Sequence, residues 1–291
     1  MRSMLLTLFF LWSVTQSTGD EQKPELKEIP DKLVVLTFDD SARSHFTVVR
    51  PVLLQYGFGA TFFITEGFDF RDNKKDYMTW DQIAQLHREG FEIGNHTQDH
   101  LGITDATVDR LEQQLKGIEK ACARHGIPRP VTFAWPGNAT TSKAFDILTE
   151  HGIRFARRGG APEYPYPEGR GFAYEPGKDH PFLLPSAGDA RPSWKLPDLI
   201  RAVKQARQGR VAILQFHGTP DTAHSWVNTS SENFKAFMKY LLIHKYTVIS
   251  LRDLSRYKMT DAVPRDPQQV IRSRQLQLKS KLKDAASGKD G

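Results

Sequence analysis

Between residues 33 and 250, short apolar runs that look like strands alternate with segments of helical periodicity. This alternation is typical of βα units that build a parallel sheet. We count seven candidate strands with mostly short connections, which favours a closed or nearly closed β/α barrel over an open doubly wound sheet. The predicted strands are residues 33–38, 60–64, 91–95, 131–135, 153–156, 211–216 and 246–250.

One helix between the third and fourth strands is especially well defined. Thr104 before it is a candidate cap, and Gly126 after it is a candidate stop. The apolar positions that recur at helical spacing are Val108, Leu111, Leu115, Ile118 and Cys122. Cys122 is the single cysteine of the chain and cannot form an internal disulfide. Its place on the apolar face predicts a buried structural thiol.

The chain of 291 residues, 39% of them hydrophobic, is long enough for one large globular domain. We assign residues 33–257 to that domain, residues 20–32 to a linker and residues 258–291 to a charged tail. Helix is expected in part of the tail, between residues 268 and 283, and a solvated terminus is the simplest interpretation of it. Residues 158–196, rich in Gly and Pro, predict a long loop over one face of the barrel.

The amino-terminal segment has the pattern of a secretory signal. A positive charge at Arg2 precedes an apolar run over residues 4–14, and small residues follow at 17–19. We predict cleavage after residue 19 and a secreted, periplasmic or cell-surface location. The alternative, a membrane anchor, needs about 20 apolar residues, so no membrane span is expected after cleavage.

The net charge of +6 and the pI near 9.3 would suit an anionic partner such as a cell wall, a membrane or nucleic acid. No concentrated block of Lys and Arg precedes residue 265. Charge alone therefore assigns no partner, and we predict no nucleic-acid binding.

Polar residues follow several predicted strands, and in a β/α barrel the carboxyl ends of the strands meet at one rim, where active sites form. Asp39 and Asp40 come directly after the first strand. Adjacent carboxylates on extended backbone point in different directions, so one can bind a cation while the other acts on a substrate or water. A helix cap or a turn is the alternative interpretation of this pair.

His96 and His100 follow the third strand at a spacing that lets both imidazoles reach one metal ion. Two imidazoles and one carboxylate are a common ligand set for catalytic zinc, with a position left open for water and substrate. The same set also fits other first-row divalent ions, so cobalt, manganese and nickel are alternatives.

Further candidates lie at the same rim. His217 ends the sixth strand, where a core or capping histidine is the alternative to a functional one. His224 could line a substrate groove. The residues that follow the fourth strand, and that we expect to contact substrate, are Trp135, Pro136, Gly137 and Asn138.

These residues resemble the ordered motifs of the polysaccharide deacetylases, which are carbohydrate esterase family 4, or NodB-homology, domains. The resemblance covers about residues 33–257 and implies a distorted (β/α) barrel. It rests on Thr37-Phe38-Asp39-Asp40, His96-Thr97-Gln98-Asp99-His100, Phe133-Ala134-Trp135-Pro136-Gly137 and the strand that ends at His217.

The resemblance also implies roles for individual residues. Asp40, His96 and His100 would be the ligands of a divalent metal ion. Such an ion polarises the acetamide carbonyl and lowers the pKa of the water molecule bound to it. Asp39 would be the general base and His217 the general acid. The backbone N–H of Ser41 would donate to the oxyanion.

The sequence departs from the family pattern in three places. Ala134 stands where the family carries an arginine that braces the base aspartate, and Gln215 replaces an apolar residue two positions before the acid histidine. The Asp and Trp pair that orients this histidine is matched only loosely by Asp189 and Trp194. Three arginines are candidates for the missing guanidinium, namely Arg157, Arg158 and Arg191.

The resemblance therefore predicts a metal-dependent hydrolase that removes N-acetyl groups from a GlcNAc-containing glycan such as peptidoglycan or chitin. One alternative is hydrolysis of another amide or of an O-acetyl ester on the same metal site. A second alternative is a carbohydrate-binding protein without turnover, against which the presence of both Asp39 and His217 argues.

Overall fold

The computed structural model describes residues 25–259 and 263–286. The predicted signal segment, residues 1–19, lies outside the described residues. None of the helices in the described part of the chain has the length and apolarity of a membrane-spanning segment.

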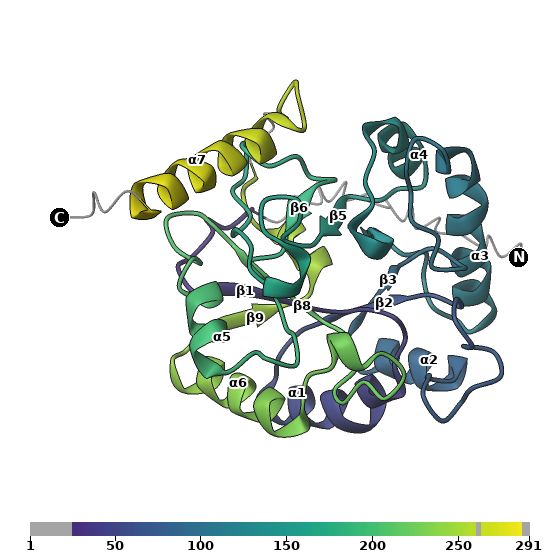
Figure 1. Cartoon of the computed structure of the whole chain (residues 1–291). Coiled ribbons are helices and arrows are strands. Elements are labelled where there is room, and N and C mark those ends of the chain that lie inside the picture. The colour runs from purple at the N-terminus through teal and green to yellow at the C-terminus, as the bar shows by residue number, and fades with distance from the viewer. Residues whose placement is uncertain (1–24, 260–262, 287–291) are drawn as a thin grey trace, which may run out of the picture.

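A nine-stranded sheet in which every strand pair is parallel forms the centre of the molecule (Figure 1). All seven predicted strands are present, with bounds that differ from the predicted ones by at most two residues. The strand order is β6-β5-β4-β3-β2-β1-β8-β7, and β9 pairs with β1 beside β2. The strands are β1 (Leu33–Phe38), β2 (Thr61–Ile64), β3 (Glu92–Asn95), β4 (Thr132–Ala134), β5 (Phe155–Arg158), β6 (Leu184–Pro185), β7 (Gly188–Asp189), β8 (Ala212–Phe216) and β9 (Thr247–Ile249).

Strands β6 and β7 bring the two ends of the sheet together. Strand β6 pairs with β5, while β7, only two residues further along the chain, pairs with β8. The predicted long loop over residues 158–196 therefore contains two short strands, and this stretch bridges the open side of the barrel. The fold is a distorted barrel of parallel strands, as predicted.

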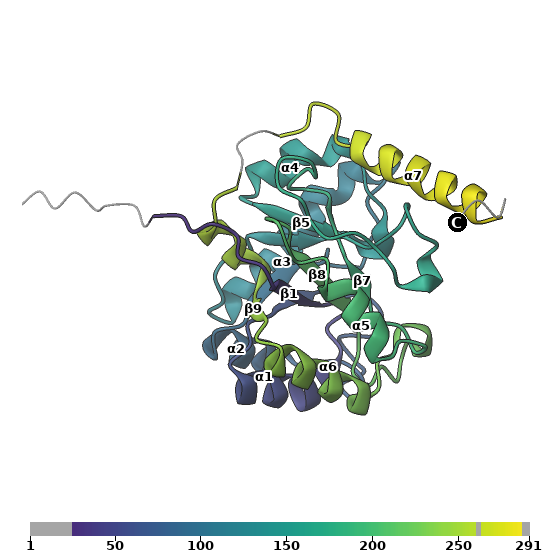
Figure 2. The same cartoon turned by 90° about the vertical axis from the view of Figure 1, so that its left-hand side faces the viewer.

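Helices surround the barrel, with α1, α2 and α6 together on one side of the sheet (Figures 1 and 2). The α-helices are α1 (Arg50–Tyr56), α2 (Trp80–Arg88), α3 (Leu111–Arg124), α4 (Phe145–Glu150), α5 (Leu196–Val203), α6 (Ser231–Ile243) and α7 (Gln269–Ala286). A π-helical turn spans His45–Val49, and 3₁₀ turns span Val108–Arg110, Pro136–Asn138, Ser142–Ala144, Tyr166–Glu168, Ser225–Val227 and Leu251–Arg256.

Helix α3 is the helix predicted between the third and fourth strands. Its predicted apolar face is buried, including the Cys122 thiol. Gly126 follows the helix with a φ of 70°, a left-handed conformation that suits a helix stop. Thr104 is not the cap, because a separate 3₁₀ turn precedes the α-helix and its N-cap is Arg110.

The core forms around β1, whose six residues are all buried. Phe38 at its carboxyl end stacks against Phe62 of β2 and Phe216 of β8, with ring centroids 5.1 and 5.4 Å apart. The apolar strand that precedes Asp39 and Asp40 is therefore packed against neighbouring strands on both sides.

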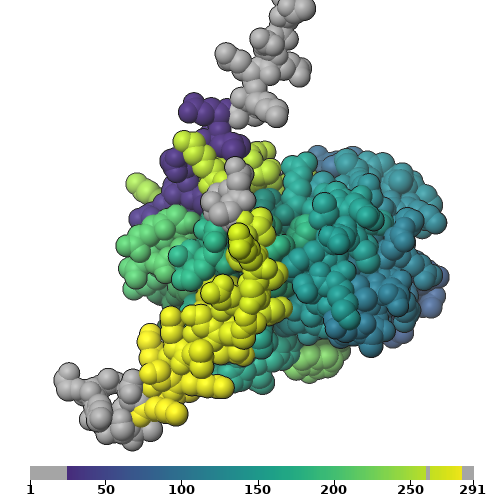
Figure 3. Space-filling view, turned by 90° about the horizontal axis from the view of Figure 1, so that it is seen from above, coloured from purple at the N-terminus to yellow at the C-terminus, as the bar shows by residue number. Residues whose placement is uncertain are grey.

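The charged tail forms α7, which lies across the outside of the domain (Figure 3). Ile271 is buried against the domain, and the buried Arg274 donates two hydrogen bonds to the carboxylate of Asp179, at 2.6 and 2.9 Å. The start of α7 is thus docked and is not the solvated terminus expected from composition. The predicted domain limits remain predictions.

Candidate metal centre and active site

The carboxyl ends of β1, β3 and β8 place the predicted chemical groups at one rim. Asp39 and Asp40 follow β1, His96 and His100 follow β3, and His217 follows β8. Because the strands of the barrel are parallel, residues far apart in sequence meet at this rim. There they line one cavity with a volume of about 130 Å³.

Asp40, His96 and His100 form a cluster that could hold a metal ion. The Nε2 atoms of both imidazoles lie 3.3 Å from Asp40 Oδ1. The ligand atoms of all three residues lie within 4.8 Å of one another. In the described part of the chain, the buried Asp40 Oδ1 has no hydrogen-bond partner. A buried carboxylate oxygen without a donor is costly, and a cation between the three groups would satisfy it.

The orientation of His96 also suits a metal ligand. Its Nδ1 lies 2.8 Å from the carbonyl oxygen of Ala134, so Nδ1 carries the proton and donates it to that oxygen. The lone pair of the neutral ring is then on Nε2, which faces Asp40. A hydrogen bond from the far side of a histidine ring is the usual device that fixes a metal ligand. The donor set therefore fits a divalent ion.

The electrostatics of the cluster keep Asp40 negative. Burial raises the pKa of Asp40, but contacts with His100 and His96 outweigh burial and hold this pKa well below its ordinary value. Burial lowers the pKa of His96, whereas the contact with Asp40 and the charges of both aspartates raise it, and the net change is upward. The site therefore favours a positive charge next to Asp40, which a proton or a metal ion can supply.

Backbone strain is concentrated at this rim. Asp40, Ser41, Thr97 and His100 have φ values of 71°, 58°, 58° and 54°. These values lie in the left-handed region that non-glycine residues seldom adopt. Such strain gathers at functional sites, where the surrounding structure holds it in place.

Asp39 is braced by Arg157. The Arg157 side chain donates from Nη2 to both carboxylate oxygens of Asp39, and both residues are buried. Gln215 Nε2 donates a further hydrogen bond of 3.1 Å to Asp39 Oδ2. Of the three candidate arginines, Arg157 thus occupies the bracing position.

The other two candidate arginines have different partners. Arg158 forms a two-point hydrogen-bonded pair with Glu163 at 2.7 Å, and Arg191 pairs with Asp189. The bracing guanidinium comes from a neighbouring strand, since Arg157 on β5 is the register partner of Ala134 on β4.

His217 lies between two carboxylates without a hydrogen bond to either. Its Nε2 is 3.9 Å from Asp40 Oδ2, and its Nδ1 is 3.8 Å from Asp189 Oδ1. The backbone of His217 is held by His45, whose Nε2 donates a hydrogen bond of 3.1 Å to the carbonyl oxygen of His217. Burial lowers the pKa of His45 to about 4, so the ring is neutral at neutral pH and donates through one nitrogen. Sequence reasoning assigned no role to His45.

The predicted substrate-contacting residues divide into two groups. Those that line the cavity are Trp135, Gly137, Asn138 and His224. Those that do not are Ser41, Pro136, Asp189 and Trp194. Trp194 is buried in the core, 6.5 Å from the Phe237 ring, and Ser41 Oγ donates to the Thr65 carbonyl at 2.8 Å. Asp189 does not line the cavity itself, but its Oδ1 lies 3.8 Å from Nδ1 of His217, which does.

Three aromatic side chains at the cavity were not predicted. Phe68, Tyr166 and Trp226 line it while 46%, 41% and 62% of their surfaces are exposed. The Phe68 and Trp226 rings flank His224, with centroids 4.6 and 5.2 Å from its ring. All three lie in loops between strands, where apolar periodicity gives no signal.

Comparisons with known proteins agree with the motifs. Residues 27–156 match the family model described as polysaccharide deacetylase. The peptidoglycan-N-acetylglucosamine deacetylase of Bacillus cereus is 31% identical over 130 residues, which are 44% of this chain and 57% of that protein. Residues 27–156 are therefore similar to the polysaccharide deacetylase family. The matches cover 33% to 57% of the curated relatives' own lengths.

Solved structures share the fold. A family 4 acetyl xylan esterase from Clostridium thermocellum, in complex with a cobalt ion, has a TM-score of 0.53 at 20% identity, over 82% of this chain and 96% of that one. BA3943 of Bacillus anthracis, described as a family 4 pseudoenzyme, has a TM-score of 0.53 at 16% identity, over 83% and 73% of the two chains. These similarities establish the NodB-like barrel and nothing beyond it.

Proposed function

We propose that the protein is a metal-dependent hydrolase that removes N-acetyl groups from a GlcNAc-containing poly- or oligosaccharide. The observation that carries this proposal is the meeting of Asp40, His96 and His100 in one cavity, with Asp39 and His217 beside them. The similarity to a peptidoglycan deacetylase supports an acetylated cell-wall glycan as the substrate.

Asp40, His96 and His100 would hold one divalent ion, with zinc as our first choice. When bound, this ion supplies a Lewis acid that polarises the acetamide carbonyl and acidifies a water molecule. Asp39 accepts the proton of the water as its oxygen adds to the carbonyl carbon. His217 donates a proton from Nε2 to the nitrogen as the C–N bond breaks, which gives acetate and a free amine.

The surroundings suit this division of labour. Arg157 and Gln215 fix the Asp39 carboxylate in one orientation. Asp189 lies on the Nδ1 side of His217, with its Oδ1 3.8 Å from that nitrogen. Export through the amino-terminal segment, to a secreted or cell-surface location, is part of the same proposal.

Acetate release tests the function directly. The purified protein should release acetate from chitooligosaccharides or peptidoglycan, should lose this activity with a chelator, and should regain it when Zn²⁺ or Co²⁺ is restored. Release from acetylated xylan alone would favour the O-acetyl esterase alternative. Binding of the glycans without release would favour a carbohydrate-binding protein.

Arg157→Lys should lower turnover about tenfold, because the lysine side chain is shorter and its ammonium lacks the fixed planar geometry that holds both hydrogen bonds to Asp39. One charge-assisted hydrogen bond contributes roughly 1.5 kcal/mol, which corresponds to about that factor. The double variant Arg157→Ala with Ala134→Arg moves the guanidinium to the register partner on β4 and should restore part of the turnover lost in Arg157→Ala. Equal turnover in all three variants and the wild type would contradict the bracing role.

Trp226→Ala should raise KM for the glycan several-fold with little change in kcat. The ring is exposed at the cavity mouth, where it can stack on a sugar face without contacting the reacting atoms. Ile243→Ala, which removes a similarly exposed apolar side chain at the end of α6, is the control. A fall in kcat at constant KM would place Trp226 in the chemical step instead.

A further inference from the structure

The five-residue loop from His96 to His100, which carries both candidate imidazole ligands, is held from outside the cavity by α3. Gln114 of α3 is only 1% exposed. Its Oε1 accepts a hydrogen bond from the backbone N–H of Asp99, and its Nε2 donates to Asp99 Oδ2, both at 2.8 Å. A buried amide that satisfies both of its ends on one loop residue fixes the backbone directly before His100.

A second contact ties the start of the loop to the same helix. Asn95 Nδ2 donates to the carbonyl oxygen of Leu115 in α3 at 3.1 Å. Asn95 Oδ1 accepts from the backbone N–H of Thr97 at 3.0 Å, which bridges the helix to the residue after His96. Each end of the loop is thus hydrogen-bonded through α3.

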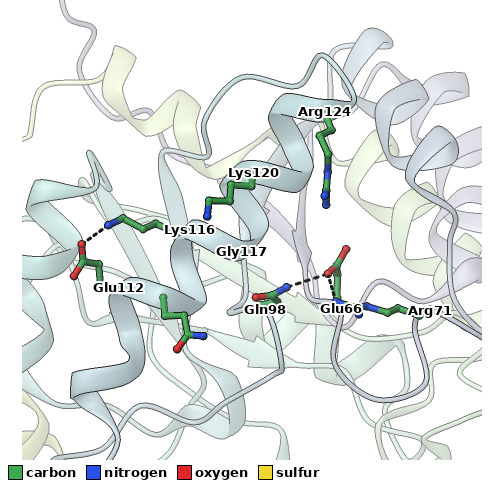
Figure 4. A pocket seen from close by; sticks show the side chains of 9 residues that line it. Glu66, Arg71, Gln98, Glu112, Lys116, Gly117, Lys120 and Arg124 are labelled. Atoms are coloured by element: carbon green, nitrogen blue, oxygen red, sulfur yellow. Dashed lines mark hydrogen bonds and ion pairs between the residues drawn. The ribbon is translucent and has the colours of Figure 1, made fainter.

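The middle of the loop packs onto a glycine of α3. The side chain of Gln98 lies against Gly117, where an added Cβ would come within 2.8 Å of the Gln98 Cβ and still closer to its amide. Figure 4 shows Gln98 between Gly117 and Glu66, which accepts from Gln98 Nε2 at 3.3 Å. Glu66 is held in turn by the Trp80 indole N–H at 2.8 Å. A larger residue at position 117 would push Gln98, and the loop with it, off the helix.

We propose that Gln114 and Gly117 are positioning residues of the metal centre, through which α3 sets the separation and direction of the two imidazoles. This inference rests on the proposed metal site. A metal site tolerates misplacement of its ligands by only about 0.5 Å, so the supporting groups determine affinity although they never touch the ion.

Gln114→Leu should weaken Zn²⁺ binding to the metal-free protein about tenfold or more, the usual scale for losing an outer support of a metal ligand. Isothermal titration calorimetry with zinc chloride measures this affinity without any assay of activity. Gln113→Leu makes the same change at the neighbouring exposed position of α3 and should bind Zn²⁺ like the wild type. A lower Tm with unchanged Zn²⁺ affinity in Gln114→Leu would reduce Gln114 to a structural role and overturn the inference.

Gly117→Ala is a second test, because an uninvolved glycine and a positioning glycine predict different changes in Tm and in Zn²⁺ affinity. Alanine normally raises the stability of a helix interior relative to glycine, so an uninvolved Gly117 predicts a higher Tm and unchanged Zn²⁺ affinity. We expect instead weaker Zn²⁺ binding, about tenfold, and no gain in Tm, because the new methyl group displaces Gln98. If wild-type protein takes up no divalent ion, the proposed function fails. If it does and both variants match it, only the positioning inference fails.

Discussion

Replacing His100 by alanine should abolish divalent-metal binding and, with it, acetate release. The imidazole Nε2 lies 3.3 Å from Asp40 Oδ1, and its loss leaves one imidazole and one carboxylate, too few protein ligands for a catalytic zinc site. The side chain of His100 is 24% exposed, so the barrel should fold without it. Metal content after dialysis and acetate release, measured on the same preparation, check both parts of this expectation.

His87→Ala is the control for this experiment. His87 lies at the end of α2, outside the cavity lining, and its loss should leave metal content and turnover unchanged. Circular dichroism separates loss of the ion from loss of the fold. A folded His100→Ala protein that binds one equivalent of Zn²⁺ as tightly as the wild type would show that the metal-centre proposal is wrong.

Strand ends explain why so much of this centre was predictable. Asp40, His96 and His100 each follow a predicted strand, and the carboxyl ends of parallel strands in a barrel meet at one rim. Their meeting needed only the order of the strands and the barrel rule. The same rule placed His217, whose neighbours in the structure are Asp40 and Asp189.

The bracing arginine could not be selected from sequence, because its position depends on register. Arg157 and Arg158 are adjacent, and on a strand their side chains point to opposite faces. Only the pairing of Ala134 with Arg157 directs the latter to Asp39. A shift of one residue in that pairing would have exchanged the two arginines.

Strands β6 and β7 and the docking of α7 were missed for a related reason. Each of the two strands has only two residues and includes Pro185 or Gly188, so neither has a periodicity of its own. Their conformation is imposed by β5 and β8. Arg274 looked like one more charge in a solvated tail, and only its pairing with Asp179, 95 residues earlier, buries it. A contact between residues so far apart in the sequence cannot be predicted from the composition of either segment.

Asp39→Asn should lower turnover at least about 10²-fold with metal affinity retained, because an amide keeps the shape of the carboxylate but cannot accept the proton of water. The proposed metal ligand is the neighbouring Asp40, which this change leaves intact. The substitution also leaves the buried Arg157 without its anion, so a loss of stability is expected together with the loss of turnover. A control must therefore reproduce the structural cost without touching the chemistry.

Asp179→Asn is that control, since Asp179 is also a buried aspartate paired with a buried arginine, Arg274, yet it does not line the cavity. Both variants should have a lower Tm, and only Asp39→Asn should lose turnover by two orders of magnitude at saturating metal. Turnover of Asp39→Asn within tenfold of the wild type would mean that another group takes the proton. A comparable loss of turnover in Asp179→Asn would mean that stability, not proton transfer, limits the rate. A general base at Asp39 predicts that both variants lose stability, that both keep their metal affinity, and that only Asp39→Asn loses turnover.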